Sequence, residues 1–224
     1  MKLYFLGSCN AQKPLIIFEN LCTQNFDFTS SAFITDGDTG ICVDFCKQKG
    51  ITVIKYSDVE QALIEDANID KKVLISIGWP KLVEERLLKM WDAAINCHGS
   101  ILPDYRGNRA YMHYWANMAP EYGATIHYMN AKFDDGNVIV QGRLKAFVEE
   151  SQHIMHRRTA ELCALLLPAA IRLVGDGYEG YVAEGEKRYF YQMTPEEFEN
   201  HRKMNMDRVS RGEKVVLTRY KELL

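Results

Sequence analysis

The chain has 224 residues, with 27 basic and 30 acidic side chains, which gives a net charge of −3. Apolar residues make up 47% of the chain, enough for a hydrophobic core and too many for a disordered protein. The mild acidity argues against a protein that works mainly by binding nucleic acid phosphates, although a local pocket can still take a small anionic substrate. The length favours one domain, alone or with a small addition.

No segment has the length and composition of a membrane span or a signal peptide. The longest apolar run, residues 162–171, is too short to cross about 30 Å of hydrocarbon. The apolar stretch at residues 3–7 is shorter than the core of a signal peptide. We therefore expect a cytoplasmic protein without membrane contact. The six cysteines form no CxxC pair and the six histidines no zinc signature, so we expect free buried thiols and no metal site.

The first hundred residues alternate short apolar runs with stretches of helical spacing. Strands are expected at 2–6, 31–35, 51–54, 72–77 and 93–97, and helices at 14–21, 40–49 and 82–90. This alternation predicts an α/β fold with a Rossmann-like, mostly parallel sheet and helices on both of its faces. Ligands of such sheets bind beyond the carboxyl ends of the strands, so we expect the active site near Gly7, Gly78 and His98.

The pattern changes after residue 120. Two strands are expected at 123–130 and 137–144, joined by a polar loop. A long helix follows at 151–175, and Pro168 inside it predicts a kink or an early end.

The end of the chain predicts a short extension. The segments 181–183 and 188–193 are expected to pair as a β-hairpin around a charged Glu-Gly-Glu-Lys turn. A capping box with proline in the first turn, at 194–197, predicts the start of a last helix. We therefore divide the chain into a catalytic core, residues 1–175, and a hairpin and helix extension, residues 176–224.

The stretch INCHGSILPDYRG carries most of the chemistry. Asn96 and His98 are two residues apart at the end of a predicted strand, so they face the same side. An amide donor beside an imidazole suits the stabilisation of an oxyanion during acyl transfer. Asp134 and Asp135 precede Gly136 in a loop, and a carboxylate there can hold the imidazole and help to move a proton. The residues alone leave a structural interpretation open, because a double Asp before Gly is ordinarily a turn.

This stretch, followed by YGATIHYMNAKFDDGNVIVQ, resembles the formyltransferase family that uses 10-formyltetrahydrofolate. The family pattern is Asn-x-His-x-Ser-Leu-Leu-Pro, then a loop with Gly, a Thr-Ile-His-like strand and Asp-x-Gly. The matching positions are Asn96, His98, Ser100, Leu102, Pro103, Gly107, Thr125, His127, Asp134 and Gly136. The match is good over residues 70–145 and loose before them. It implies the formyltransferase fold.

The resemblance also implies a mechanism of direct transfer, without a metal or a covalent enzyme intermediate. The acceptor amine attacks the formyl carbon, Asn96 and His98 hydrogen-bond the oxyanion of the tetrahedral intermediate, and Asp134 pairs with His98 and assists the proton transfer. Asp135 stands where relatives often have a small residue, so it receives no catalytic role. Cys97 is expected to point to the other face of its strand, into the core.

The resemblance places the folate pocket at the end of the strand before the catalytic strand and in the loop before Asp-x-Gly. The residues that it assigns to the cofactor 10-formyltetrahydrofolate are Ser76, Ile77, Gly78, Trp79, Asn130, Phe133 and Gly136. The first of these stretches looks shorter than in relatives, which leaves the individual folate contacts open. The residues expected to bind the acceptor are Ser8, Asn10, Arg106, Gly107, Asn108, Arg188, Tyr189 and Tyr191. The aromatic residues of the last strand suit base stacking, and packing on the long helix is the alternative.

Three acceptors fit the family. Transfer RNA needs a further domain and a basic surface, which this sequence does not show. Glycinamide ribonucleotide, the substrate in purine synthesis, remains an alternative, but Gly7-Ser8-Cys9-Asn10 matches the phosphate loop of those enzymes only in part, and they carry His-Pro-Ser where this chain has His98-Gly99-Ser100.

The chain is most similar to the short N-formyltransferases of nucleotide-linked amino sugars. We therefore expect a nucleotide-linked amino-deoxysugar as acceptor, a 4-amino sugar, in glycan or lipopolysaccharide biosynthesis. The resemblance further implies a homodimer with no nucleic acid partner. A non-catalytic folate-binding or scaffold protein is the alternative from another class.

Overall fold

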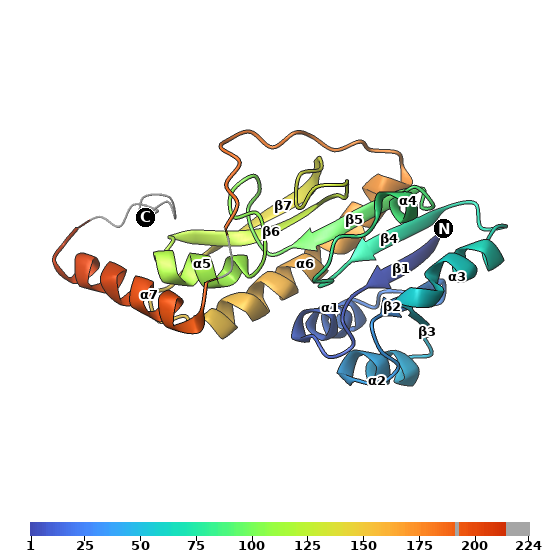
Figure 1. Cartoon of the computed structure of the whole chain (residues 1–224), viewed down its shortest axis with the longest axis horizontal. Helices are drawn as coiled ribbons and strands as arrows, with labels where there is room; N and C mark the ends of the chain where they lie inside the picture. Colours follow the sequence, from blue (N-terminus) through green and yellow to red (C-terminus); the bar gives the residue numbers. More distant parts are fainter. Residues whose placement is uncertain (191–192, 214–224) are drawn as a thin grey trace.

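A seven-stranded sheet runs through the protein (Figure 1). The computed structural model describes residues 1–190 and 193–213. The strands are β1 Lys2–Leu6, β2 Ser31–Thr35, β3 Thr52–Lys55, β4 Lys72–Ser76, β5 Ala93–His98, β6 Glu121–Tyr128 and β7 Val138–Lys145. Their order is β3-β2-β1-β4-β5-β6-β7. The first five in that order pair in parallel, whereas β6 pairs antiparallel with both β5 and β7, so the mostly parallel sheet is confirmed.

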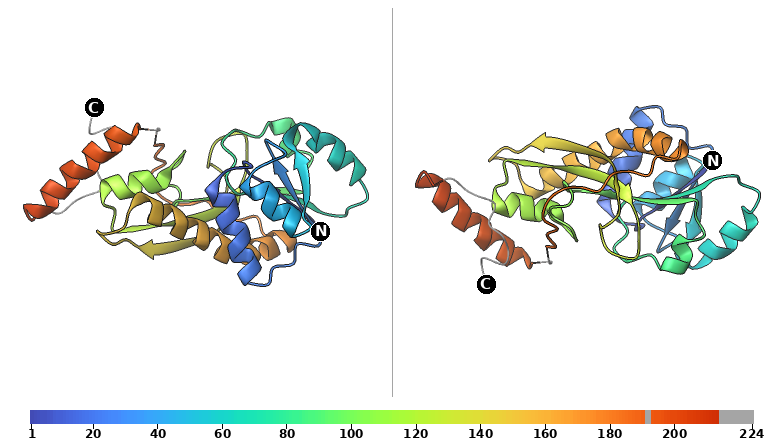
Figure 2. Two further views of the ribbon diagram at one scale, coloured as in Figure 1. Left: turned by 90° about the horizontal axis from the view of Figure 1, so that it is seen from below. Right: turned by 90° about the horizontal axis from the view of Figure 1, so that it is seen from above.

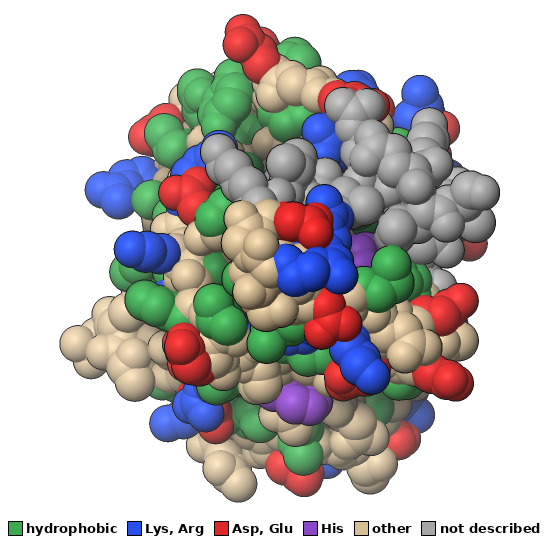
Figure 3. Space-filling model, turned by 90° about the vertical axis from the view of Figure 1, so that its left-hand side faces the viewer, with side chains coloured by type: hydrophobic (Ala, Val, Ile, Leu, Met, Phe, Trp, Pro, Cys, Tyr) green, Lys and Arg blue, Asp and Glu red, His purple; other side chains and the backbone are tan. Residues whose placement is uncertain are grey.

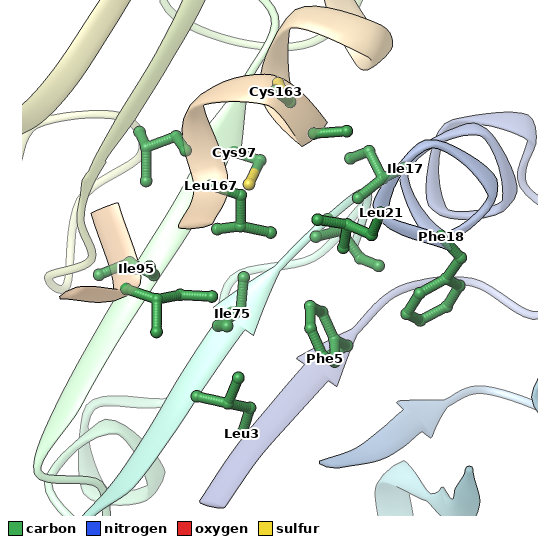
Figure 4. Close-up of a cluster of buried hydrophobic side chains, with 14 of the residues drawn as sticks. Leu3, Phe5, Ile17, Phe18, Leu21, Ile75, Ile95, Cys97, Cys163 and Leu167 are labelled. Carbon is green, nitrogen blue, oxygen red and sulfur yellow. The ribbon is translucent and has the colours of Figure 1, made fainter. Parts of the chain in front are cut away.

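Helices cover both faces of the sheet, as expected. They are α1 Gln12–Thr23, α2 Ile41–Gln48, α3 Val59–Glu65, α4 Glu85–Leu88, α5 Ala110–Asn117, α6 Gln152–Gly175 and α7 Pro195–Ser210, with a 3₁₀ turn at Tyr56–Asp58. In β1, Leu3 and Phe5 face the core beneath α1, α2 and α6 (Figure 4). Tyr4 and Leu6 face the opposite core, which α3 and α4 cover.

The long helix α6 continues past Pro168 to Gly175. The expected early end is therefore wrong. Leu167, Ala170 and Ile171, around the proline, are buried in the core that α6 shares with α1. This packing of an apolar face outweighs the hydrogen bond that proline cannot donate.

Two short helices were not expected from the sequence, α3 and α5. Neither has a side chain that caps its first turn. Arg109, the residue before α5, adopts a left-handed backbone conformation with φ 57°. Helix α5 is held instead by packing, because Tyr114 and Met112 lie in a buried cluster with Phe198 of α7.

The expected hairpin does not form among the described residues of the segment after α6, 176–190 and 193. Tyr181 forms an antiparallel bridge with Val138 of β7, and Tyr189 forms a parallel bridge with Arg106 in the loop after β5. Each half of the segment thus finds backbone partners elsewhere, the first on the edge strand β7 and the second on the loop after β5. The segment crosses the molecule above the sheet (orange in Figure 1).

The last described helix begins where the sequence predicts it. Thr194 accepts a hydrogen bond from the Glu197 backbone N–H at 3.2 Å, and the Glu197 carboxylate accepts one from the Thr194 N–H at 2.6 Å, which completes the capping box. Both views in Figure 2 place α7 at the end of the molecule opposite α3. At this end of the molecule, acidic and basic side chains alternate over the visible surface (Figure 3). None of the helices in the described part of the chain is long and apolar enough to cross a bilayer.

Candidate active site

Strands β5 and β6 place polar side chains opposite one another. Asn96 pairs in register with His127, and His98 with Thr125. The Nδ2 atom of Asn96 lies 3.2 Å from Nε2 of His127. Because neighbouring strand residues face opposite sides, Cys97 points away from this group and is buried in the core beside Cys163 (Figure 4), as expected.

Asp134, in the loop between β6 and β7, joins this group. Its Oδ1 atom lies 3.4 Å from Nδ1 of His98 and 3.5 Å from Nε2 of His127. The same oxygen accepts a hydrogen bond from Asn96 Nδ2 at 3.2 Å. Its Oδ2 accepts from the backbone N–H of Gly107 at 2.9 Å. The sequence separates these residues widely, but the fold brings Asn96, His98 and Asp134 within mutual reach.

A close backbone approach explains the glycine in the Asp-x-Gly pattern. A Cβ atom at Gly136 would lie 1.9 Å from the carbonyl oxygen of Tyr128, so only glycine fits there. Asp134 itself has φ 49°, a conformation that costs free energy for a non-glycine residue. This tight turn directs the Asp134 carboxylate toward β5.

The hydrogen bonds of His98 fix its tautomer. Its Nε2 atom lies 3.0 Å from the carbonyl oxygen of Tyr105. Since a carbonyl only accepts, Nε2 carries the hydrogen and Nδ1 faces Asp134. Burial lowers the pKa of His98, although the charge of Asp134 opposes this shift. The imidazole is therefore neutral at pH 7, with a free Nδ1 lone pair.

Asp134 is ionised in the same environment. Burial would raise its pKa, but at the acidic pH where Asp134 titrates both histidines are protonated, and the charge of His98, the hydrogen bond and charge of His127 and the Gly107 N–H outweigh burial and hold the pKa below its usual range. The group thus consists of a neutral imidazole, a carboxylate beside it and an amide donor. These groups can stabilise an oxyanion and move a proton between two nitrogens.

A cavity of about 570 Å³ opens at these side chains. The residues expected to contact the cofactor that line it are Ser76, Gly78, Trp79, Asn130 and Phe133. Ile77 does not line it, because its side chain is fully buried in the core. Gly136 does not line it either, since it packs against Tyr128. These two residues have structural rather than ligand contacts in this structure.

The residues expected to bind the acceptor divide in the same way. Gly107, Asn108 and Tyr189 line the cavity. Ser8 and Asn10 do not, because Ser8 Oγ donates to Asp36 at 3.0 Å and Asn10 Oδ1 accepts from the Ile41 N–H at 3.4 Å.

The two expected arginines are also engaged elsewhere. Arg106 is buried and donates to Asp135 and Tyr189. Arg188 lies away from the cavity, 3.6 Å from Asp104 and 3.5 Å from Glu186. Tyr191 falls outside the described residues.

Several cavity residues were not assigned from the sequence. They are Lys13, Lys81, Arg109, Tyr111, His127, Lys132 and His156. His127 stands in the Thr-Ile-His strand, and the register of β5 with β6 places it beside Asn96. Lys13 and His156 come from α1 and α6, and Arg109 and Tyr111 from the start of α5, so only the tertiary fold brings them together.

Comparison with known proteins shows that the chain is similar to formyltransferases. A family model described as formyl transferase matches residues 36–171. The GDP-perosamine N-formyltransferase of Brucella melitensis biotype 1 is 32% identical over 133 residues, which cover 58% of this chain and 50% of that protein. The protein of the same name from Brucella abortus matches equally. The chain thus spans about half the length of the curated relatives it matches.

Solved structures share the fold at low sequence identity. Phosphoribosylglycinamide formyltransferase from Anaplasma phagocytophilum has a TM-score of 0.67 and 18% identity, covering 86% of this chain and 98% of that chain. The N-formyltransferase from Helicobacter canadensis, in complex with folinic acid and dTDP-3-aminofucose, has a TM-score of 0.66 and 17% identity, covering 92% and 80%. These similarities confirm the α/β fold expected from the sequence.

Proposed function

Because this chain belongs to the formyl transferase family, we propose that it transfers a formyl group from 10-formyltetrahydrofolate to the amino group of a nucleotide-linked amino-deoxysugar. The observation that carries this proposal is the convergence of Asn96, His98 and Asp134 on one cavity. Its volume, about 570 Å³, lies in the range of small-molecule sites.

The three side chains divide the work of the reaction. This division differs from the one expected from the sequence, because a neutral His98 whose N–H donates to Tyr105 has no hydrogen left for the oxyanion. As the acceptor amine attacks the formyl carbon, Asn96 Nδ2 turns one of its two N–H groups from Asp134 or His127 toward the oxyanion that develops there. His98 Nδ1, left without a hydrogen by the bond from Nε2 to Tyr105, accepts the proton of the attacking amine. It then returns this proton to the folate nitrogen as the bond to the formyl carbon breaks. Asp134 stabilises the imidazolium between these two steps.

One flank of the cavity suits the folate. Trp79 is stacked on Tyr56 with ring centroids 4.7 Å apart, and its Nε1 atom is buried without a hydrogen-bond partner among the described residues. A polar heterocycle beside Trp79 would satisfy this donor. Asn130 and Phe133 line the cavity from the loop after β6. The cofactor supplies the formyl carbon, and this flank holds its pterin ring.

The acceptor is inferred from the relatives. The curated relatives at 32% identity are enzymes named for an amino sugar linked to GDP. Within this class we propose a 4-amino sugar as the acceptor. Glycinamide ribonucleotide stays the second candidate because structures of purine enzymes share the fold.

The proposal also covers the division of the chain, its location and its assembly. We place the catalytic core in residues 1–175 and the extension in 176–224. We further propose a cytoplasmic homodimer that acts in glycan or lipopolysaccharide biosynthesis.

One experiment tests the proposed function directly. The protein is incubated with 10-formyltetrahydrofolate and a panel of GDP-, UDP- and dTDP-linked 3- and 4-amino sugars, with glycinamide ribonucleotide in parallel. Mass spectrometry then detects the addition of one formyl group. We expect this addition on a nucleotide-linked 4-amino sugar. Formylation of glycinamide ribonucleotide alone would replace the proposal by its alternative, and folate binding without turnover on any amine would favour a binding protein.

A further inference from the structure

The cavity wall is positively charged, although the chain as a whole is acidic. Lys13, Lys81, Arg109 and Lys132 line it, and Asp134 is the sole carboxylate among the described lining residues. None of these four cations has a carboxylate oxygen of a described residue within 4.0 Å. Basic side chains elsewhere are often paired, as Arg106 is with Asp135. Unpaired cations around a cavity attract an anionic ligand.

The four cations belong to two flanks of the cavity. Lys81 lies next to Trp79, with its Nζ atom 5.9 Å from the ring centroid, and Lys132 precedes Phe133. They border the flank that we assign to the folate. Lys13 and Arg109 come from other elements, the first turn of α1 and the residue before α5.

Two side chains link Lys13 and Arg109 into one group. His156 of α6 and Tyr111 of α5 lie with ring centroids 4.6 Å apart, and both line the cavity. Burial, followed by the charge of Lys13, lowers the pKa of His156 to about 4. Arg109 in turn acts electrostatically on Tyr111. Lys13 and Arg109 therefore line the same cavity as this pair of rings, whose histidine is neutral at pH 7.

The position of Lys13 connects this group to the reacting centre. Its ammonium group donates a hydrogen bond to the backbone carbonyl of Cys97, the residue between Asn96 and His98. An ammonium group has three N–H donors, so two remain for a ligand. An anion bound to Lys13 thus lies beside the two side chains that we assign to the reaction.

We infer that Lys13 and Arg109 form the binding site for the diphosphate of the nucleotide-linked acceptor. This inference rests on the proposed function. Two cations on separate elements are better suited to a ligand with two linked phosphates than to a ligand with a single carboxylate. The arginine expected from the sequence to meet phosphate, Arg188, is instead paired with Asp104 and Glu186 outside the cavity.

Binding measurements without turnover test this site. Titration calorimetry compares GDP with guanosine, and dTDP with thymidine, on the full chain and on Lys13→Met and Arg109→Gln. We expect the wild-type chain to bind one of the diphosphates about 10-fold or more tightly than its nucleoside. In each variant the affinity for the diphosphate should fall close to the affinity for the nucleoside, and the affinity for the nucleoside should stay unchanged. Lys203→Met is the matched control, because it removes the same charge from the exposed surface of α7 and should keep the difference.

Other outcomes would overturn the assignment. In the first, the wild-type chain shows no preference for the diphosphate over the nucleoside. In the second, both variants keep the preference of the wild-type chain. In the third, the variants lose affinity for folinic acid and keep their affinity for the nucleotide. The Arg109 side chain is exposed and has no hydrogen bond or ion pair among the described residues, so Arg109→Gln keeps the test valid if Lys13→Met folds poorly. The chain could transfer no formyl group to any amine and still prefer the diphosphate in a way that depends on Lys13. That result would refute the proposed function and support the diphosphate site.

Discussion

The buried Arg106 forms an ion pair with the half-buried Asp135, the residue that follows Asp134 in the chain. Lys187 adds a second cation to Asp135, at 2.8 Å. The hydroxyl of Tyr189 accepts from Arg106 at 3.2 Å and donates to the carbonyl of Phe133 at 3.2 Å. The pair therefore ties the loop after β5 to the loop that carries Asp134, and the segment after α6 braces both. Asp135, which has no catalytic role in our assignment, positions the carboxylate beside it.

The first prediction concerns stability. Hydrogen bonds from Arg106 and Lys187 lower the pKa of Asp135 from 3.8 to about 2. A lowered pKa in the folded state stabilises the protein above the unfolded pKa, and this contribution disappears as the pH falls to the folded pKa. The shift corresponds to about 2 kcal/mol. We expect Asp135→Asn to lower the free energy of unfolding at pH 7 by about this amount.

Urea unfolding between pH 7 and pH 2 measures this effect. The difference between the wild-type chain and Asp135→Asn should stay constant down to about pH 4 and then narrow toward pH 2. Lys187→Met, which removes the more exposed partner, should cost less. A difference that does not depend on pH would show that the ion pair is not the source of the stability.

The second prediction is that the same change lowers the rate. Small misplacements of reacting groups cost up to about 100-fold in rate, so we expect kcat of Asp135→Asn to fall about 10-fold or more. The Michaelis constant for the folate should change little, because Asp135 does not line the cavity. Steady-state kinetics at pH 7 separate the two constants. A rise in that Michaelis constant at unchanged kcat would assign Asp135 to folate binding instead.

The third prediction compares three neighbouring residues on β5. Asn96→Ala and His98→Ala should each lower kcat by about 10² to 10³-fold, because the first removes an oxyanion donor, which contributes about 3–4 kcal/mol in the transition state, and the second removes the general base. Cys97→Ala should keep kcat near the wild-type value, because its thiol points into the core. Transfer rates measured under saturating conditions decide this. Wild-type rates in both of the first two variants, or the loss of activity in Cys97→Ala, would disprove the assignment.

The fourth prediction concerns His127, which matches the family pattern but received no role from the sequence. Its Nδ1 atom lies 2.8 Å from the Tyr128 carbonyl and must carry the hydrogen, so Nε2 accepts from Asn96. His127→Phe removes this acceptor, so the Asn96 amide is no longer held in its orientation. We expect kcat to fall about 10-fold. His127→Gln retains a polar group and should recover part of the rate. Equal rates in both variants would mean that His127 serves packing alone.

The sequence predicts best what depends on local pattern. The strands at 2–6 and 31–35 were expected with their observed bounds, because buried parallel strands are continuous apolar runs. The last helix follows from its capping box. Asn96 and His98 follow from alternation along one strand, but their partnership with Asp134 came from the family pattern.

What the sequence misses depends on tertiary contacts. The hairpin near residue 185 was expected because two apolar runs flank a turn, yet each run pairs with a different part of the chain. Arg106 was expected to bind the acceptor, and the fold instead buries it against Asp135. Lys13 lies in a helical turn that carries no motif, and only the tertiary fold brings its ammonium to the Cys97 carbonyl of β5.

The fifth prediction is the pH dependence of the reaction. Burial lowers the pKa of His98, so the imidazole loses its proton below the usual histidine value of 6.5. If neutral Nδ1 accepts the proton of the amine, kcat/KM falls on the acid side with a midpoint below pH 6.5. The charge of Asp134 favours the imidazolium and raises this pKa, so Asp134→Asn should move the midpoint to still lower pH while it lowers the rate. Profiles of kcat/KM from pH 4.5 to 8 test both shifts. A midpoint that moves upward in Asp134→Asn would contradict His98 as the base, because no other change in that variant favours the protonated ring.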